Sequence, residues 1–260
     1  MTPQGAIQIA LILCSVWHAH HALELLIARR LGHLAMLEIV NLRSPAENRI
    51  VGVTRTQAVF CALTWARLAA AANCLVAVAV GWDEWPAVPL LAASALYFAW
   101  VRQVGGDGAE EMALLVTLAI LACTGPLSSP STALAANYFI AGQCLLAYFV
   151  AGVAKLGSMT WLSGEALGLV TQTETYGHPA VNRLIRARPL VGRIATWSAL
   201  LFEVTTPPAV LFSPSAAYVL VAVGAVFHVT CAYVMGLNGF LLAFASAYPS
   251  VLAASSNWHS

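Results

Sequence analysis

Residues 133–156 read ALAANYFIAGQCLLAYFVAGVAKL, an apolar run that carries a single charged side chain, Lys155. A helix needs about 20 mostly apolar residues to cross the hydrocarbon core of a bilayer, and this run is long enough. The same criterion, applied along the whole chain, predicts eight membrane-spanning helices. They cover residues 6–28, 57–80, 86–101, 110–124, 133–156, 195–212, 215–235 and 238–254.

The composition of the chain also indicates a membrane protein. Hydrophobic residues make up 60% of the 260 residues and charged residues 9%, whereas a soluble domain carries about 25% charged residues. The mean hydropathy is +0.79. The net charge of +1 leaves no basic surplus to neutralise phosphates, which argues against nucleic acid as a partner. We therefore expect an all-α polytopic bundle in the lipid bilayer, forming one domain over residues 1–260.

Basic residues orient the bundle, because Lys and Arg gather in short cytoplasmic loops. Ten of the twelve basic residues fall on one side of the eight-span arrangement, which places the 29–56 and 157–194 loops in the cytoplasm. If the first run lies in the membrane interface instead, the spans number seven. The 157–194 loop is amphipathic in part and is expected to form an interfacial helix. The expected location is the inner membrane of a bacterium.

Two basic residues, Arg67 and Lys155, lie within or at the end of apolar segments. A charge in the hydrocarbon core costs at least about 2.5–3.5 kcal/mol, so such a residue faces the bundle interior or extends to the headgroups. Lys155 is therefore either a snorkelling lysine or a desolvated base. Arg67 is expected either to pair with Glu203 or to bind an anionic group of a substrate.

Residues 148–156, YFVAGVAKL, are followed by Trp161 and Gly164. This pattern resembles the Tyr-Phe-x-Ala-Gly-x-x-Lys-Leu motif, with its later Trp and Gly, of the vitamin K-dependent gamma-glutamyl carboxylases. Their bacterial relatives form the HTTM (horizontally transferred transmembrane domain) family. Residues 227–240, FHVTCAYVMGLNGF, are similar to the Phe-His segment that precedes the last membrane hairpin of that family. The resemblance covers roughly residues 85–255.

In the carboxylases the lysine of this motif deprotonates vitamin K hydroquinone, so the resemblance implies that Lys155 is a catalytic base and that a reduced quinone is involved. It also implies a catalytic role for His228 and an acidic cavity residue at Glu203. The residues alone leave His228 open, because a lone histidine within a span is often an interhelical hydrogen-bond partner. Trp161 is expected at the rim of the cavity, in contact with the substrate. The family's association with peptide maturation implies a peptide substrate or a partner enzyme.

An acidic stretch, GGDGAEEM, occupies residues 105–112. Asp107, Glu110 and Glu111 either cap a helix and favour the positive end of its dipole, or project into the cavity of Lys155. In the second case they would bind a cation or orient a substrate amine.

Residues 17–26, WHAHHALELL, form another polar constellation. On a helix His18 and His21 are i,i+3 neighbours, and His20 and Glu24 are i,i+4 neighbours. This stretch offers three candidate metal ligands, which are His18, His21 and Glu24. The alternative is a proton-handling or structural polar stripe. No metal is assigned from the sequence.

These observations support a leading hypothesis and two alternatives. The first is a membrane enzyme that uses Lys155 as a base on a quinol or other lipid-soluble substrate, in peptide or natural-product modification. The second is a non-catalytic membrane subunit, scaffold or immunity protein for a partner enzyme. The third is a proton-coupled transporter, although the chain has no visible repeated halves.

Overall fold

The computed structural model describes residues 1–30, 57–102 and 108–258, and within these ranges the regular structure is entirely helical. The all-α class expected from the sequence is thereby confirmed. In chain order the elements are α1 (Pro3–Arg30), α3 (Gln57–Val80), α4 (Val88–Arg102), α5 (Ala109–Ala122), η2 (Gly125–Leu127), α6 (Pro130–Leu156), α7 (Met159–Leu162), α8 (Ala166–Val170), α9 (Pro179–Ala187), α10 (Pro189–Phe212), α11 (Pro214–Met235) and α12 (Asn238–Trp258).

Six helices of the described chain, α1, α3, α6, α10, α11 and α12, are long and apolar enough to cross a membrane. Each matches a span predicted from the sequence. The predicted spans 86–101 and 110–124 do form helices, α4 and α5, but these have only 15 and 14 residues. At 1.5 Å per residue they are about 22 and 21 Å long, shorter than the hydrocarbon core of about 30 Å. Helix α1 has spanning length as well, and its placement across or along the membrane stays a prediction.

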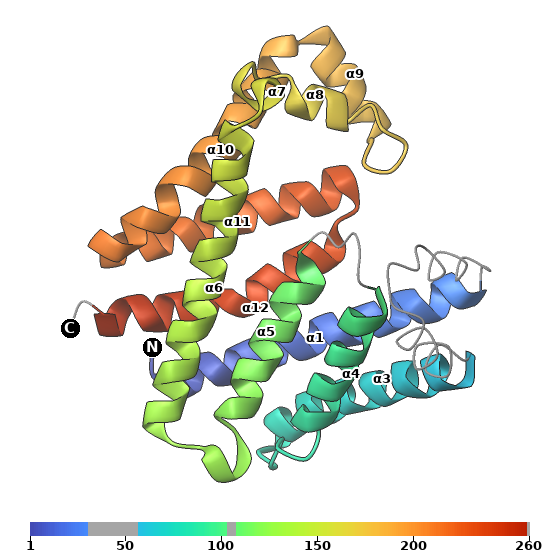
Figure 1. Ribbon diagram of the computed structural model, residues 1–260, viewed down its shortest axis with the longest axis vertical. Helices are drawn as coiled ribbons and strands as arrows, with labels where there is room; N and C mark the ends of the chain where they lie inside the picture. Colours follow the sequence, from blue (N-terminus) through green and yellow to red (C-terminus); the bar gives the residue numbers. More distant parts are fainter. Residues whose placement is uncertain (31–56, 103–107, 259–260) are drawn as a thin grey trace, which may run out of the picture.

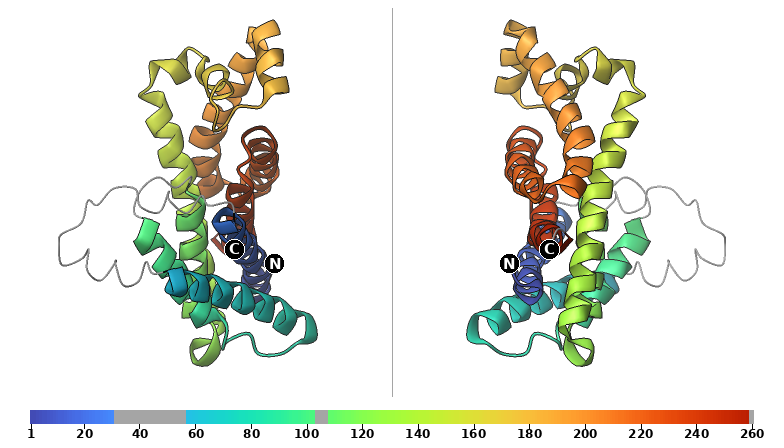
Figure 2. Two further views of the ribbon diagram at one scale, coloured as in Figure 1. Left: turned by 90° about the vertical axis from the view of Figure 1, so that its right-hand side faces the viewer. Right: turned by 90° about the vertical axis from the view of Figure 1, so that its left-hand side faces the viewer.

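Helix α12 lies at the centre of the bundle (Figure 1). It packs against α1, α5, α6 and α11. Its buried positions include many small residues, which let helix backbones approach closely inside a membrane. They include Ala243, Ser246, Ala247, Ser250 and Ala254. Helices α1 and α12 run antiparallel side by side, so the start of α1 lies near the end of α12 (Figures 1 and 2).

Proline, serine and glycine set the helix boundaries. Pro130 and Pro189 occupy the first turns of α6 and α10, where a missing N–H costs no helical hydrogen bond. The Ser129 hydroxyl caps α6 by accepting the backbone N–H of the residue three positions later, at 3.1 Å. Helix α11 ends at Gly236, whose φ of 72° is left-handed. This lets the chain reverse at once into α12, so that α11 and α12 form a tight hairpin.

Helices α7, α8 and α9 gather beyond the end of α6 and the start of α10 (Figures 1 and 2). They make up most of the 157–194 segment. Helix α9 has the expected amphipathic character, because Arg183 and Arg186 are exposed while Ile185 faces Gly168 and Gly192. Its position at the lipid headgroups stays a prediction. Most of the other Arg-rich loop, 29–56, lies outside the described residues.

Candidate functional site

One face of α6 carries the main candidate site. Tyr148, Gly152 and Lys155 occupy positions i, i+4 and i+7, a spacing that places them on the same side of the helix. Lys155 Nζ donates a hydrogen bond to Glu203 Oε2 on α10 at 2.5 Å. The Glu203 side chain is 5% exposed and that of Lys155 is 20% exposed, so the ion pair is largely shielded. Lys155 Nζ also lies 5.0 Å from the centroid of the Trp161 ring, within the range of a cation–π contact.

Gly152 accounts for the close approach of α6 and α10. A Cβ atom at this position would lie 2.8 Å from Val204 Cγ2 and 3.0 Å from Glu203 Cβ, closer than carbon atoms pack. The absence of a side chain therefore lets α10 lie directly against α6. As a result the Glu203 carboxylate comes within reach of Lys155, three residues further along α6.

A chain of hydrogen bonds runs from Tyr148 to the two helices of the C-terminal hairpin. The Tyr148 hydroxyl lies 2.6 Å from His228 Nε2 on α11 and 2.8 Å from the Tyr248 hydroxyl on α12. Either Tyr148 donates to His228 and accepts from Tyr248, or both bonds run in the opposite direction. The two arrangements differ in the positions of the protons but not in those of the heavy atoms. His228 Nδ1 is buried and has no hydrogen-bond partner among the described residues.

Aromatic rings surround this hydrogen-bond chain. The centroid of the His228 ring lies 4.4 Å from that of Phe240 and 4.6 Å from that of Phe244. Gly224 stands one turn before His228 on α11, and a Cβ atom there would lie 2.5 Å from the Tyr248 hydroxyl. Gly224 thus makes room for that hydroxyl. The histidine is completely buried, in surroundings that are apolar apart from the tyrosine hydroxyls.

A second polar cluster lies between α1, α3 and α5. Arg67 Nη1 donates a hydrogen bond to His21 Nδ1 at 2.5 Å, and His21 Nε2 lies 2.7 Å from Glu110 Oε1. Arginine has only donors, so His21 Nδ1 accepts this hydrogen bond. The guanidinium carbon also lies 5.3 Å from the ring centroid of Trp17 and 4.8 Å from that of Phe98. The buried Arg67 is thus linked to Glu110 through an imidazole ring.

The residues that the motif resemblance singled out lie close together. Lys155, Glu203 and Trp161 are in direct contact. His228 lies beside them, linked to the same face of α6 by its hydrogen bond to Tyr148. A cavity lined by these residues, and the chemical role of each, stay predictions.

The other predicted substrate-binding residues lie elsewhere. Arg67 pairs with His21 and not with Glu203, so the expected Arg67–Glu203 pairing is wrong. Glu110 contacts the same histidine and Glu111 is exposed. Asp107 lies outside the described residues, and α5 has Gly108 as its N-cap, without a side-chain capping bond.

The three candidate metal ligands on α1 have separate contacts. His18 Nε2 lies 2.8 Å from the Thr117 hydroxyl, His21 contacts the arginine and glutamate of the second cluster, and Glu24 lies 3.5 Å from His20. Within the described ranges of the chain, no three His, Cys, Asp or Glu side chains are arranged to hold a metal ion. The alternative of a polar stripe on α1 agrees better with these contacts.

Sequence reasoning did not assign roles to Tyr148, Tyr248, Gly152 or Gly224. Two of them could have been found, because Tyr148 and Gly152 precede Lys155 by seven and three residues and so share its helix face. Gly224 likewise precedes His228 by one turn. No local pattern identifies Tyr248, which meets Tyr148 across 100 residues of sequence.

The fold and these clusters define a multi-pass α-helical membrane protein with ionisable side chains buried between its helices. The pattern of the HTTM domain matches residues 123–258, just over half of the chain. The chain belongs to the HTTM domain family. The matched region contains the Lys155–Glu203 pair and the Tyr148–His228 contact, whereas Arg67 and its partners precede it.

One curated relative is the uncharacterized protein YitO of Bacillus subtilis (strain 168), which is 30% identical to this chain over 162 residues. The alignment covers 54% of this chain and 51% of YitO. The chain therefore spans about half the length of this curated relative. No solved structure matches the chain.

Proposed function

We propose that this protein is a membrane enzyme in which Lys155 acts as a general base on a quinol or another lipid-soluble acidic substrate. The contact between Lys155 and Glu203 supports this most strongly, because the only lysine of the chain meets a carboxylate at 2.5 Å between two membrane-spanning helices. Ionisable side chains inside a membrane are costly and usually functional. The resemblance of residues 148–156 to the carboxylase motif favours proton abstraction over other roles.

Proton transfer within the pair would activate the lysine. An ammonium group has no free electron pair, so Lys155 becomes a base only after it loses a proton. Transfer of that proton from Nζ to Glu203 Oε2 gives a neutral amine and a neutral acid, which creates no uncompensated charge in the bundle. The amine then takes the proton of a substrate O–H group. The products of this step are a substrate oxyanion and an ammonium that stabilises it.

The neighbouring residues have roles that suit this step. The Trp161 ring would hold the ammonium when Glu203 is protonated, through the cation–π contact already in place. The chain of Tyr148, His228 and Tyr248 would accept or return the second proton of a quinol. Its aromatic surroundings exclude water, which strengthens every electrostatic interaction in the site.

The overall reaction follows from the resemblance to the carboxylases. A quinol anion reacts with dioxygen, and the balanced change converts one hydroquinone and one O₂ into one quinone epoxide and one water. The molecule modified in a coupled step is a peptide or a small lipid-soluble compound, presented at the membrane or by a partner enzyme. The α7–α9 segment directly follows Lys155 and is the nearest surface for such a partner. We place the enzyme in a bacterial inner membrane.

The same ion pair also favours one alternative. A Lys–Glu contact between α6 and α10 can simply hold two spans together in a non-catalytic subunit, scaffold or immunity protein. The charge of residue 155 would then matter, but its basicity would not. Arginine separates the two cases, because its guanidinium keeps the charge and can pair with a carboxylate but is not deprotonated in proteins.

The test is quinol-dependent oxygen uptake by the purified protein in lipid nanodiscs, with analysis for quinone epoxide. Lys155→Arg should keep the melting temperature of the wild type and lose both uptake and epoxide. Val219→Leu, at a position on α11 that is 53% exposed, serves as the control and should keep both. Uptake by Lys155→Arg equal to that of the wild type would contradict base catalysis. Background-level uptake by the wild type, even with a peptide co-substrate, would contradict it as well.

A further inference from the structure

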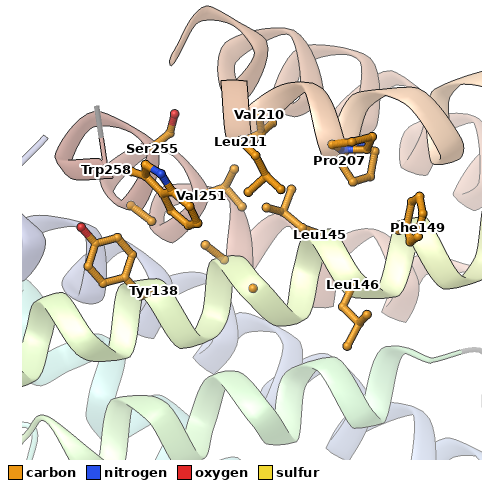
Figure 3. Close-up of a pocket in the computed structure, with 14 residues that line it drawn as sticks. Tyr138, Leu145, Leu146, Phe149, Pro207, Val210, Leu211, Val251, Ser255 and Trp258 are labelled. Atoms are coloured by element: carbon orange, nitrogen blue, oxygen red, sulfur yellow. The ribbon is translucent and has the colours of Figure 1, made fainter. Parts of the chain in front are cut away.

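A groove of about 370 Å³ lies between α6, α10 and α12 (Figure 3). Its volume falls within the range of about 300–1,000 Å³ that is typical of ligand pockets. The walls are almost wholly apolar and include Leu145, Phe149, Leu211, Val251 and Trp258. Several of these side chains are partly exposed, Phe149 at 41% and Leu211 at 42%. Because these helices have spanning length, that exposed side faces the hydrocarbon of the bilayer.

On each of the three helices, one residue that lines the groove lies about one helical turn from a residue of the hydrogen-bond chain or of the ion pair. On α6, Leu145 precedes Tyr148 by three residues. On α12, Val251 follows Tyr248 by three residues. On α10, the groove residue Pro207 follows Glu203 by four residues. The groove therefore adjoins the polar site along the bundle.

The side chain of Lys155 is folded so that its Nζ lies toward the groove. Lys155 Nζ lies 3.5 Å from the backbone oxygen of Ala151, so the side chain folds back along α6 toward its N-terminus, as helical side chains generally do. The nitrogen thus lies near the level of residue 151. Phe149, at the nearest end of the groove on α6, is about 3 Å further along the helix axis.

Two local features keep the groove open. A Cβ atom built at Gly142 meets no atom within 4 Å, so α6 leaves this part of the wall empty. On α10, Pro207 and Pro208 have no backbone N–H group. The backbone carbonyls of Glu203 and Val204, four residues earlier, therefore have no helical hydrogen-bond donor. Prolines inside a helix kink it. The groove is therefore encoded by a glycine and a proline pair.

The far end of the groove has the residues of a membrane interface. Tyr138 and Trp258 line it, with their ring centroids 6.4 Å apart, and such rings are enriched at the headgroup level. From Tyr138 to Tyr148 α6 rises about 15 Å. The groove thus extends from the interface to the polar site in the interior of the bundle.

We propose that this groove binds the hydrocarbon tail of the substrate whose polar head reacts at Lys155. The inference rests on the proposed function and deepens it by naming an amphipathic substrate with a single apolar tail. One water molecule occupies roughly 30 Å³ of liquid water. If a methylene group is given the same volume, the groove holds on the order of a dozen methylene groups. The tail would lie between α6, α10 and α12, and its end would point toward Tyr138 and Trp258.

Photo-crosslinking in nanodiscs tests the tail site separately from catalysis. The probe is a benzoquinol with a ten-carbon tail that carries a diazirine near its end. We expect labelled peptides from α6 and α12 at the groove, competed by the same quinol without the diazirine but not by excess oleate. Labelling should persist in Lys155→Arg, and retained labelling together with background-level uptake by the wild type would count against the proposed reaction alone. Labelling that is spread over α11, or that oleate removes equally well, would show an ordinary lipid chain in the groove and overturn the inference.

A groove-filling variant gives the second measurement. Gly142→Leu should displace about two methylene groups of the tail and weaken the ten-carbon quinol by about tenfold in KM. Gly142→Leu should leave kcat unchanged, and also the KM of a quinol without a tail. The lipid-facing Val219→Leu should change neither kcat nor the KM of either quinol. If Gly142→Leu folds and has the same KM for the tailed quinol as the wild type, the tail does not occupy the groove.

Discussion

Replacing Gly152 with alanine tests whether the close approach of α6 and α10 positions the Lys155–Glu203 pair. The new methyl group would lie 2.8 Å from Val204 Cγ2 and 3.0 Å from Glu203 Cβ, whereas carbon atoms pack best at about 3.5–4.0 Å. Relief of this clash requires the two helices to separate or the side chains of α10 to shift. Overpacking of this kind costs about 1–3 kcal/mol. The movement would also stretch the hydrogen bond between the lysine and the carboxylate.

A matched substitution on the same helix isolates the clash. Gly142→Ala meets no atom within 4 Å, so it should be neutral or slightly stabilising. Alanine is favoured over glycine by about 1 kcal/mol in a helix interior at either position, and this preference cancels when the two variants are compared. Gly152→Ala should therefore have a free energy of unfolding about 1–3 kcal/mol lower than that of Gly142→Ala.

Denaturant titration in detergent micelles, followed by tryptophan fluorescence, measures this difference. Quinol-dependent oxygen uptake in nanodiscs then shows whether the shifted helix also disturbs the reaction. With a quinol that has no tail, we expect Gly152→Ala to lose most of the uptake at temperatures where it is still folded, and Gly142→Ala to keep it. Equal unfolding midpoints and equal uptake for the two variants would refute the claim that the glycine sets the helix contact.

The second polar cluster and the tyrosine chain give two further predictions. Arg67→Leu leaves the Glu110 carboxylate without its cation and should lower the free energy of unfolding by about 3 kcal/mol, whereas Arg67→Leu combined with Glu110→Leu should recover most of the loss. Equal stability of the single and double variants in the same titration would argue against the link through His21. Tyr248→Phe removes the hydroxyl that meets Tyr148 and should cost about 1 kcal/mol. An unchanged unfolding midpoint would mean that this hydrogen bond contributes nothing.

Hydropathy predicted the helical class and the positions of the helices, because the apolar runs are long and are interrupted by turn-forming residues. Residues 86–101 and 110–124 also form helices, but these are shorter than the six helices of spanning length. Hydropathy reports composition, whereas spanning depends on how many residues keep helical geometry. Helices α4 and α5 are apolar but have only 15 and 14 residues.

The candidate site was predicted in part. The resemblance singled out Lys155, Glu203 and His228, whereas the helix face that Tyr148 and Gly152 share with Lys155 was not identified from the sequence. The pairing of Arg67 with Glu203 was wrong, since both side chains are buried charges within spans and a single sequence does not tell which helices are adjacent. In the structure α3 packs against α1, so Arg67 meets His21 instead.

Chemical rescue tests the central claim, that Lys155 acts as a base, most directly. Ethylamine is added to Lys155→Ala to replace the missing amine, and quinol-dependent oxygen uptake is measured. The same measurement with ethylguanidinium is the comparison, because this cation has the same charge as protonated ethylamine but does not act as a base. The account predicts that uptake rises with ethylamine concentration and stays at background with ethylguanidinium. Equal restoration by both cations would show that only the charge opposite Glu203 matters and would contradict the account.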